Sequence, residues 1–194
     1  MRKIVSKQSE SKKKKRNQTI LGVFLVVVML GGVFGVVVNS FGSRDKVSKK
    51  ITYNGFEFVN QNGFWVTVIG DFTFGFRNNP NEVENINSEL NLLNEYSGKP
   101  LYIYSENAEA AAEISGNLFY NNGIALRKHD ACLEGKECEG DLPVKNCSEN
   151  FIIIEESEKI SVIQNESCVF IQGPQKNLTK ITDGFLFKIL GIEQ

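Results

Sequence analysis

The stretch PLYIYSENAEAAAEISGNLFYNNGIALR, residues 100–127, decides the fold class. Its first six residues are typical of a short buried strand, and Ser105 is placed to cap a helix over 106–122. Asn122-Gly123 is a stop signal for that helix, and 123–127 has the composition of a second strand. A strand, a helix and a strand with short links form a right-handed βαβ unit, which predicts a parallel strand pair. The helix residues expected to point inward are Ala110, Ile114 and Leu118.

Before this unit, aromatic and β-branched residues predict a three-stranded antiparallel meander. Its strands fall around 56–58, at 64–69 and at 72–76, with turn signals at 62–63 and 70–71. Strict alternation in the third strand places three phenyl rings on one face, which favours a core face over a platform for stacking sugars or bases. These three residues are Phe72, Phe74 and Phe76.

Residues 80–97 predict a further helix between the meander and the βαβ unit. Asn79 suits the N-cap, Pro80 the first helical position and Glu82 the third. Apolar residues then recur at spacings of three, four and three, as on one side of a helix. They are Val83, Ile86, Leu90 and Leu93.

The C-terminal part predicts three more strands and a last helix. The strands are 151–155, 159–163 and 168–171, and the helix runs over about 175–190 with Gly191 as its cap. We therefore expect an α+β fold: a mixed β-sheet domain with a three-stranded meander, a βαβ unit, a C-terminal meander and about three helices. The apolar side of the last helix consists of Leu178, Ile181, Phe185 and Ile189.

The N-terminal region predicts a membrane anchor. Five basic residues at 12–16 precede the uncharged apolar stretch 19–38, whose length as a helix is about 30 Å, the thickness of a bilayer's hydrocarbon core. Basic residues stay in the cytoplasm, so the rest of the chain is expected outside the cell membrane. The predicted order is a basic cytoplasmic head (1–18), a transmembrane helix (19–38), a tether (39–50) and an extracytoplasmic domain (51–194).

Two alternatives concern this apolar stretch. Small residues at Ser40-Phe41-Gly42 could allow cleavage as a signal peptide, but apolar cores of signal peptides are usually about 7–15 residues, so the length favours an uncleaved anchor. Gly31 and Gly35 form a Gly-x-x-x-Gly pair that could bring two helices together in a dimer. Glycine is also simply common in membrane helices, and that reading is the favoured one.

The charge balance of the outward part excludes one class of partner. The first 39 residues hold eight of the 22 Lys and Arg residues and one of the 23 acidic ones, which leaves 14 basic and 22 acidic residues and a net charge of −8. Nucleic acids require a basic face, so we expect no nucleic-acid partner. The expected partners are the lipid bilayer and a protein at the cell surface.

All four cysteines follow the predicted anchor, which indicates two disulfides in an oxidising compartment. Three connectivities are possible, and the pairing favoured here is Cys132 with Cys138 and Cys147 with Cys168. If a third strand separated the last two, they would be about 9–10 Å apart and beyond disulfide reach, unless Cys147 lay in a loop that folds over. Candidate N-glycosylation sequons begin at Asn146, Asn165 and Asn177.

No motif predicts catalysis or a cofactor. His129 is the only histidine, and its spacing to the cysteines matches no zinc knuckle. His129 and Cys132 could also be a thiol nucleophile and its base, but a surface histidine beside a disulfide-bonded cysteine is favoured. The acidic loop 130–141 does not follow the order of a calcium-binding loop, so a solvated loop is favoured. Glu106, Glu109 and Glu113 share a helix side, which is ordinary complementarity to the helix dipole rather than evidence of acid–base chemistry.

Several segments together resemble a group of uncharacterised single-span, surface-anchored α+β proteins of archaea. The resemblance implies a surface-displayed α+β domain and supplies no site residues. The segments are Gln18–Gly22 after the lysine run, Tyr53–Phe58, Asn78–Ile86, the Cys147 and Cys168 pair, and Ile189–Ile192.

A second likeness is to archaeal type IV pilin-like precursors. These also place a basic head and a Gln-Ser/Thr pair before the apolar helix, as at Gln18-Thr19. Where those precursors have Gly or Ala before the processing point and Glu at the helix start, this chain has Asn17 and Gly22-Val23.

The sequence thus predicts a membrane-anchored extracytoplasmic binding or scaffold module that is not an enzyme and takes no cofactor. A type IV pilin-like surface subunit is the first alternative. A surface hydrolase or metal-dependent enzyme is the second.

Overall fold

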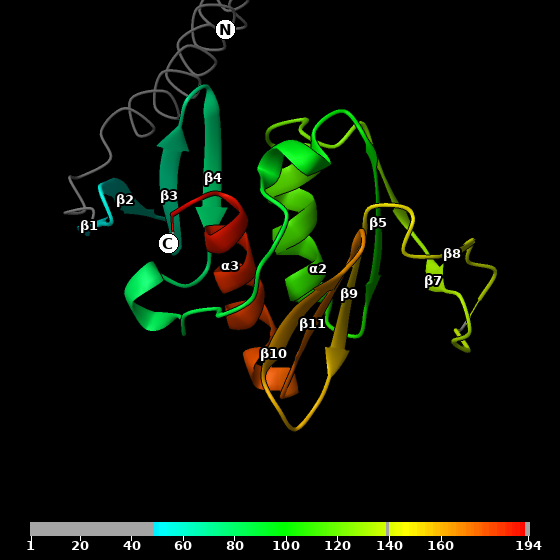
Figure 1. Cartoon of the computed structure of the whole chain (residues 1–194). Helices are drawn as coiled ribbons and strands as arrows, with labels where there is room; N and C mark the ends of the chain where they lie inside the picture. Colours follow the sequence, from blue (N-terminus) through cyan, green and yellow to red (C-terminus); the bar gives the residue numbers. More distant parts are fainter. Residues whose placement is uncertain (1–48, 139, 193–194) are drawn as a thin grey trace, which may run out of the picture. The chain divides into compact units, whose positions relative to one another are not determined.

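The computed structural model describes residues 49–138 and 140–192, all within the unit Ser48–Gln194. This part is a mixed α+β fold with a four-stranded, a five-stranded and a two-stranded sheet (Figure 1). The predicted α+β class is therefore confirmed, with two α-helices in the described residues instead of about three.

The four-stranded sheet is an antiparallel meander in chain order, with one strand more than predicted. The added strand is β1, which begins inside the predicted tether and is joined to β2 by Asn54-Gly55, both with positive φ. This dipeptide is a hairpin signal of the same kind as Asn62-Gly63. The strands are β1 (Lys50–Tyr53), β2 (Phe56–Gln61), β3 (Phe64–Ile69) and β4 (Phe72–Phe76).

The inner face of this sheet carries the phenyl rings that the alternation predicts. Phe58, Phe74 and Phe76 are fully buried. Phe72 differs from the prediction, because it lies at the end of β4 opposite Ile69 and remains 39% exposed.

The five-stranded sheet has the order β10-β11-β9-β5-β6. The predicted C-terminal meander is wrong, since β11 lies between β9 and β10 and is parallel to β9. Burial gives the reason. In β11, Val169 and Ile171 are buried toward the helices and Cys168 is buried on the other face, as expected of an inner strand. Ile163 of β10 is 53% exposed, as expected of an edge strand. The strands are β5 (Pro100–Ser105), β6 (Arg127–Asp130), β9 (Phe151–Glu156), β10 (Ser161–Asn165) and β11 (Cys168–Gly173).

The predicted βαβ unit is present, and β5 and β6 are parallel. Its helix is α2 (Ala108–Ser115), followed by a π-helical turn, η3 (Gly116–Tyr120). Its cap is Asn107 rather than Ser105, because the Asn107 side chain accepts a hydrogen bond from Ala110 N–H. The second strand begins at Arg127 instead of residue 123, since the N–H of Ala125 bonds to Leu118 and not to a strand.

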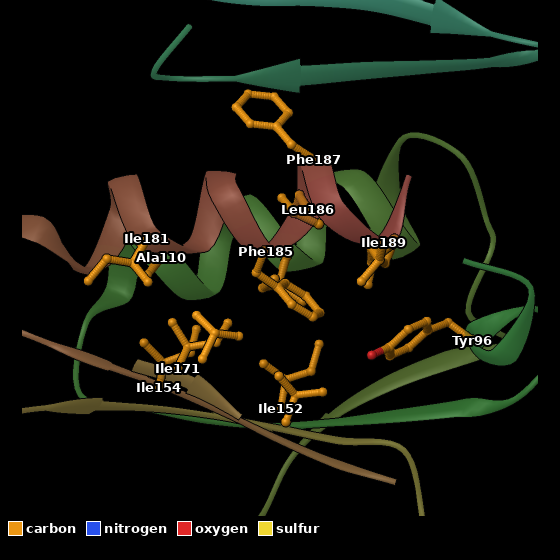
Figure 2. Close-up of a cluster of buried hydrophobic side chains, with 14 of the residues drawn as sticks. Tyr96, Ala110, Ile152, Ile154, Ile171, Ile181, Phe185, Leu186, Phe187 and Ile189 are labelled. Carbon is orange, nitrogen blue, oxygen red and sulfur yellow. The ribbon is translucent and has the colours of Figure 1, made fainter. Parts of the chain in front are cut away.

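The last helix is the middle layer of the fold. A short turn, η4 (Gln175–Asn177), leads into α3 (Leu178–Ile189), and Gly191 ends it with a positive φ as predicted. Figure 2 shows Phe187 pointing to the strands of one sheet, while Phe185 points toward Ile152 and the other sheet. The Phe187 ring lies 4.5 Å from that of Phe76 and 5.9 Å from that of Phe58. The two larger sheets therefore share one core through α3.

The predicted helix over 80–97 is wrong. Only two short 3₁₀ turns form, η1 (Pro80–Glu82) and η2 (Leu93–Tyr96), although Asn79 does cap the first. Residues 83–92 are instead irregular, and Val83, Ile86 and Leu90 still pack on the core. Four Asn and Ser residues in this stretch weaken a helix, and Ser88 Oγ–H donates to Val162 C=O of β10 instead.

A loop with two disulfides lies on the side of the five-stranded sheet away from the helices. We call it the cystine flap, residues 131–138 and 140–150. It contains β7 (Cys132–Leu133) and β8 (Val144–Lys145), which pair in parallel. Ala131, Leu133 and Cys147 pack on Phe151 and Ile153 of the sheet.

The predicted head, transmembrane helix and Gly31–Gly35 pair lie outside the described residues, as do tether residues 39–48. Within the part that the structure describes, no helix has the length and apolar character needed to cross a membrane.

Candidate functional site

A groove of about 600 Å³ lies between the outer face of β3–β4 and the α2–η3 helix. Two glycines leave space in it, because a Cβ on Gly75 would meet nothing within 4 Å and one on Gly116 only the Asn121 amide at 3.8 Å. The sheet side of the groove is lined by Gln61, Asn62, Phe64, Val66, Thr73, Gly75 and Arg77, and the helix side by Ala112, Glu113, Gly116, Asn117 and Asn121.

Side-chain amides hold the helix against the free edge of β4. Asn117 Nδ2 donates to Gly75 C=O at 2.8 Å, and Gly75 N–H donates to Asn117 Oδ1 at 2.9 Å. Asn122 makes the same pair of bonds with Thr73, both at 3.0 Å. The two asparagines take the place of a fifth strand. The backbone N–H and C=O groups of Thr73 and Gly75 are therefore hydrogen-bonded, and the wall of the groove is held in position.

Arg77 stands at one end of the groove, just after β4. Its Nε donates to Glu113 Oε1 at 2.9 Å, and its Nη1 lies 3.6 Å from Glu109 Oε1. The guanidinium carbon is 5.5 Å from the centre of the Phe64 ring, a cation–π distance. Arg77 therefore joins the sheet to α2 and supports the ring of Phe64.

Behind Arg77, Glu113 forms a buried carboxyl pair with Asp183 of α3. Asp183 Oδ2 accepts hydrogen bonds from the N–H and the Nδ2 of Asn78, each at 2.9 Å. Burial, followed by the charge of Glu113, raises the pKa of Asp183 to about 8. Burial also raises the pKa of Glu113, although Arg77 opposes this.

These shifts keep a proton on Asp183. A pKa of about 8 leaves this carboxyl protonated at neutral pH, while the ion pair with Arg77 favours the charged form of Glu113. No group in the described residues donates to Asp183 Oδ1, the oxygen left to carry the proton that bonds to Glu113. The two carboxyls, one on α2 and one on α3, therefore titrate as a coupled pair.

The three predicted glutamates do not form one site. Glu109 and Glu113 meet at Arg77. Glu106 precedes the helix and closes the end of the sheet, where its Oε2 accepts a hydrogen bond from Glu156 N–H at 2.7 Å. It fills the gap between the ends of β5 and β9, the position where open α/β sheets often bind ligands.

The structure joins Cys132 to Cys138 and Cys147 to Cys168, the pairing that the sequence analysis favours. The second bond is within reach because β11 lies directly beside β9, and the Cα atoms of its cysteines are 4.8 Å apart. With all four sulfurs in disulfides, none is a thiolate ligand or nucleophile.

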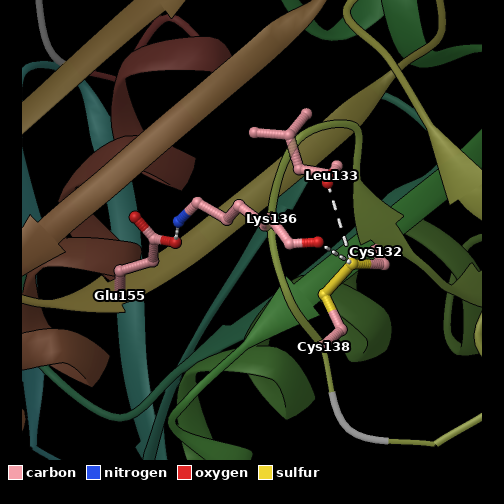
Figure 3. The surroundings of a disulfide bond; sticks show 5 residues. All are labelled: Cys132, Leu133, Lys136, Cys138 and Glu155. Atoms are coloured by element: carbon pink, nitrogen blue, oxygen red, sulfur yellow. Dashed lines mark hydrogen bonds and ion pairs between the residues drawn. A yellow bond between two sulfur atoms is a disulfide. The ribbon is translucent and has the colours of Figure 1, made fainter.

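The Cys132–Cys138 loop places a lysine over the sheet. Figure 3 shows Lys136 reaching Glu155, with which it forms an ion pair, while the C=O groups of Lys136 and Leu133 lie 3.5 and 3.7 Å from Cys132 Sγ. Lys136 Nζ is also 5.7 Å from the centre of the Tyr104 ring. The loop therefore covers Glu155, which is 9% exposed.

His129 lies on the sheet face that the flap covers, with its ring stacked 6.0 Å from that of Tyr102. Lys145 Nζ is 4.5 Å from the centre of the same tyrosine ring. Asp130 of the predicted acidic loop pairs with Lys128. Within 49–138 and 140–192, no three His, Cys, Asp or Glu side chains gather in a way that could hold a metal ion.

A second groove, of about 370 Å³, lies between residues 83–88, β10 and the start of α3. Its apolar lining includes Val83, Val162 and Ile181. Asn177, one of the predicted sequon residues, also lines it and is half-buried, whereas Asn146 and Asn165 are exposed.

Sequence reasoning missed Arg77, Asn117 and Asp183. A signal for Asp183 was present in the sequence. Leu186 and Phe187 lie outside the predicted apolar side of the last helix, which indicates that other parts of the protein pack on two sides of this helix. The single acidic residue of such a helix is then buried. Asn117 carries no comparable signal, because its role depends on β4 lying alongside.

No protein-family model, curated protein or solved structure matches this chain, so the function is argued from the site alone.

Proposed function

We propose that this chain is a membrane-anchored extracytoplasmic binding module whose β3–β4/α2 groove takes an oligosaccharide. One observation carries the proposal. The ionisable side chains at the groove are paired with one another, whereas its other exposed polar side chains are uncharged: three carboxamides and the hydroxyl of Thr73.

The amides suit hydroxyl-rich ligands. Gln61, Asn62 and Asn121 are exposed at the groove, and a carboxamide both donates and accepts hydrogen bonds, as a sugar hydroxyl does. Phe64, which is 41% exposed, offers a ring against which the apolar face of a sugar can pack. The space over Gly75 and Gly116 leaves room for the ligand.

The paired carboxylates favour binding over catalysis. A general acid or base must reach the proton that it transfers. Glu113 is 5% exposed and is bonded to Arg77 and to Asp183. A surface hydrolase would need this carboxylate to leave both partners, so a non-enzymatic module is the simpler reading.

Membrane display is supported by the sequence and by the disulfides. The uncharged stretch 19–38 follows a basic block and is long enough to span a bilayer. Two disulfides fit an oxidising compartment outside the cytoplasm. The net charge of −8 after residue 39 agrees with a solvated domain that is repelled by anionic lipid.

Binding is tested with the full chain in lipid nanodiscs and oligosaccharides released from the surface of its own cells. Saturation-transfer NMR should detect contact, and Phe64→Ala, Asn62→Ala and Asn121→Ala should each weaken binding at least fivefold. Val68→Ala is the matched control, because Val68 is 64% exposed on β3 but does not line the groove. Unchanged binding in all three variants would refute the site, and release of shorter sugars during the assay would favour the hydrolase.

Topology is tested separately on intact cells. Added protease should digest the domain after residue 48, and the mature protein should retain Met1. A mature N-terminus near Gln18 would instead support the pilin-like subunit. Protection of the domain from protease would refute membrane display.

A further inference from the structure

One row of large side chains crosses four strands on the flap side of the five-stranded sheet. The register places Ile163 opposite Phe170, Phe170 opposite Ile153, and Ile153 opposite Tyr104. Ile153 is fully buried and Phe170 half-buried, while Ile163 is 53% exposed. The cystine flap thus covers the row from the Tyr104 side and leaves the β10 end open.

Asn165 lies at this open end. It is two residues after Ile163 on β10, so both side chains project from the same face, with about 7 Å between their Cα atoms. It pairs with Cys168 across the two-residue turn of the β10–β11 hairpin. Its own side chain is exposed.

Asn165 also begins the sequon Asn165-Glu166-Ser167. We propose that Asn165 carries an N-linked glycan, which covers the open end of the row at Ile163 and Phe170. The inference rests on the proposed extracytoplasmic location, because the sugar donor is used on that side of the membrane. The donor is a lipid-linked oligosaccharide. The Asn165 Nδ2–C1 bond forms, the bond from C1 to the lipid phosphate oxygen breaks, the lipid phosphate leaves, and a base of the transferase takes one amide proton.

The other two sequons lack this setting. Asn177 is half-buried at the entry to α3, where the next residue, Leu178, is fully buried. Asn146 is exposed, but it lies in the cystine flap and its Oδ1 accepts from Ser148 N–H and Oγ–H. Asn177 lines the second groove rather than the end of the row, and Asn146 is not a strand neighbour of Ile163.

The test uses the full chain purified from membranes of its own cells. Peptide mass mapping should find the peptide with Asn165 shifted by the mass of a glycan. Asn165→Gln and Ser167→Ala should both remove that mass, whereas Asn146→Gln should leave it in place. Loss of the glycan should increase self-association in detergent at least twofold, and Ile163→Thr added to Asn165→Gln should reverse the increase.

Three outcomes would contradict the inference, and they differ in what else they imply. If protease reaches the domain on intact cells but Asn165 is unmodified, the glycan is refuted while membrane display stands. If the domain is protected and Asn165 is unmodified, both proposals fail. A glycosylated Asn165 whose removal leaves self-association unchanged refutes the covering role.

Discussion

Asp183→Asn is expected to remove a pH dependence of stability that the wild-type chain carries. Asp183 is fully buried on α3, and burial beside Glu113 raises its pKa from 3.8 to about 8. In the unfolded chain the same carboxyl loses its proton near its ordinary pKa of ~3.9. Between these two pH values the folded state holds a proton that the unfolded state has released. The free energy of unfolding therefore falls as pH rises, until the folded pKa is passed.

The magnitude follows from one proton. Its retention changes the free energy of unfolding by about 1.4 kcal/mol per pH unit. From pH 5 to pH 7 the wild type should lose about 3 kcal/mol that Asp183→Asn keeps. Asparagine retains an oxygen that accepts from Asn78 and supplies an N–H toward Glu113, so it resembles the neutral acid without its titration.

The assay is urea unfolding of the full chain in detergent micelles at pH 5, 6 and 7. Trp65 is the only tryptophan and packs on the core, so its fluorescence reports unfolding of the domain. Glu109→Gln is the control, because this carboxylate is 64% exposed and its removal should leave the slope unchanged. A difference between wild type and Asp183→Asn that stays constant over this range would refute the raised pKa of Asp183.

Three further comparisons test the hydrogen bonds at the β4 edge, the packing at Gly184 and the two disulfides. Asn117→Ala should lower the free energy of unfolding by about 1–3 kcal/mol, because it leaves the N–H and C=O of Gly75 unpaired. Urea unfolding should show a smaller loss for Asn122→Ala, because its two bonds to Thr73 are exposed. Gly184→Ala should cost about 1–3 kcal/mol, because the new Cβ would lie 2.7 Å from Val83 Cγ1. A thermal melting curve like that of the wild type would contradict the contact between residues 83–86 and α3. Replacing Cys147 and Cys168 by serine should lower the free energy of unfolding by about 3 kcal/mol, and replacing Cys132 and Cys138 by serine should lower it by about 2 kcal/mol. The first loss is larger because the entropy of loop closure grows with loop length, and the cysteines are 21 residues apart in the first pair and 6 in the second. Equal losses in denaturant would show that loop length is not the deciding factor.

Local signals in the sequence were sufficient wherever neighbouring residues determine the structure. The Asn62-Gly63 turn, the phenyl alternation through Phe76 and the cap at Gly191 were all readable, because each depends on a few adjacent residues. The βαβ unit was also readable, since short links allow few topologies.

The features that the sequence did not predict depend on contacts between residues far apart in the chain. Residues 83–92 have helix-like apolar spacing, but their contacts with β10 and with Gly184 of α3 decide their conformation. The position of β11 between β9 and β10 follows from which strand is buried on both faces, and this is not visible in a single strand. The groove shares this origin, because Arg77 follows β4 and Asn117 lies in η3, while Asp183 of α3 stands behind them.

The central position of α3 has a consequence for biosynthesis. Residues 178–189 form the layer on which both larger sheets pack, and every strand precedes them in the chain. As the polypeptide is synthesised, all eleven described strands emerge while the apolar inner faces still lack their cover. A nascent chain arrested before residue 178 would thus expose Phe58, Phe76 and Ile152 together, so completion of folding must wait until the ribosome has translated the segment that contains Phe185 and Phe187.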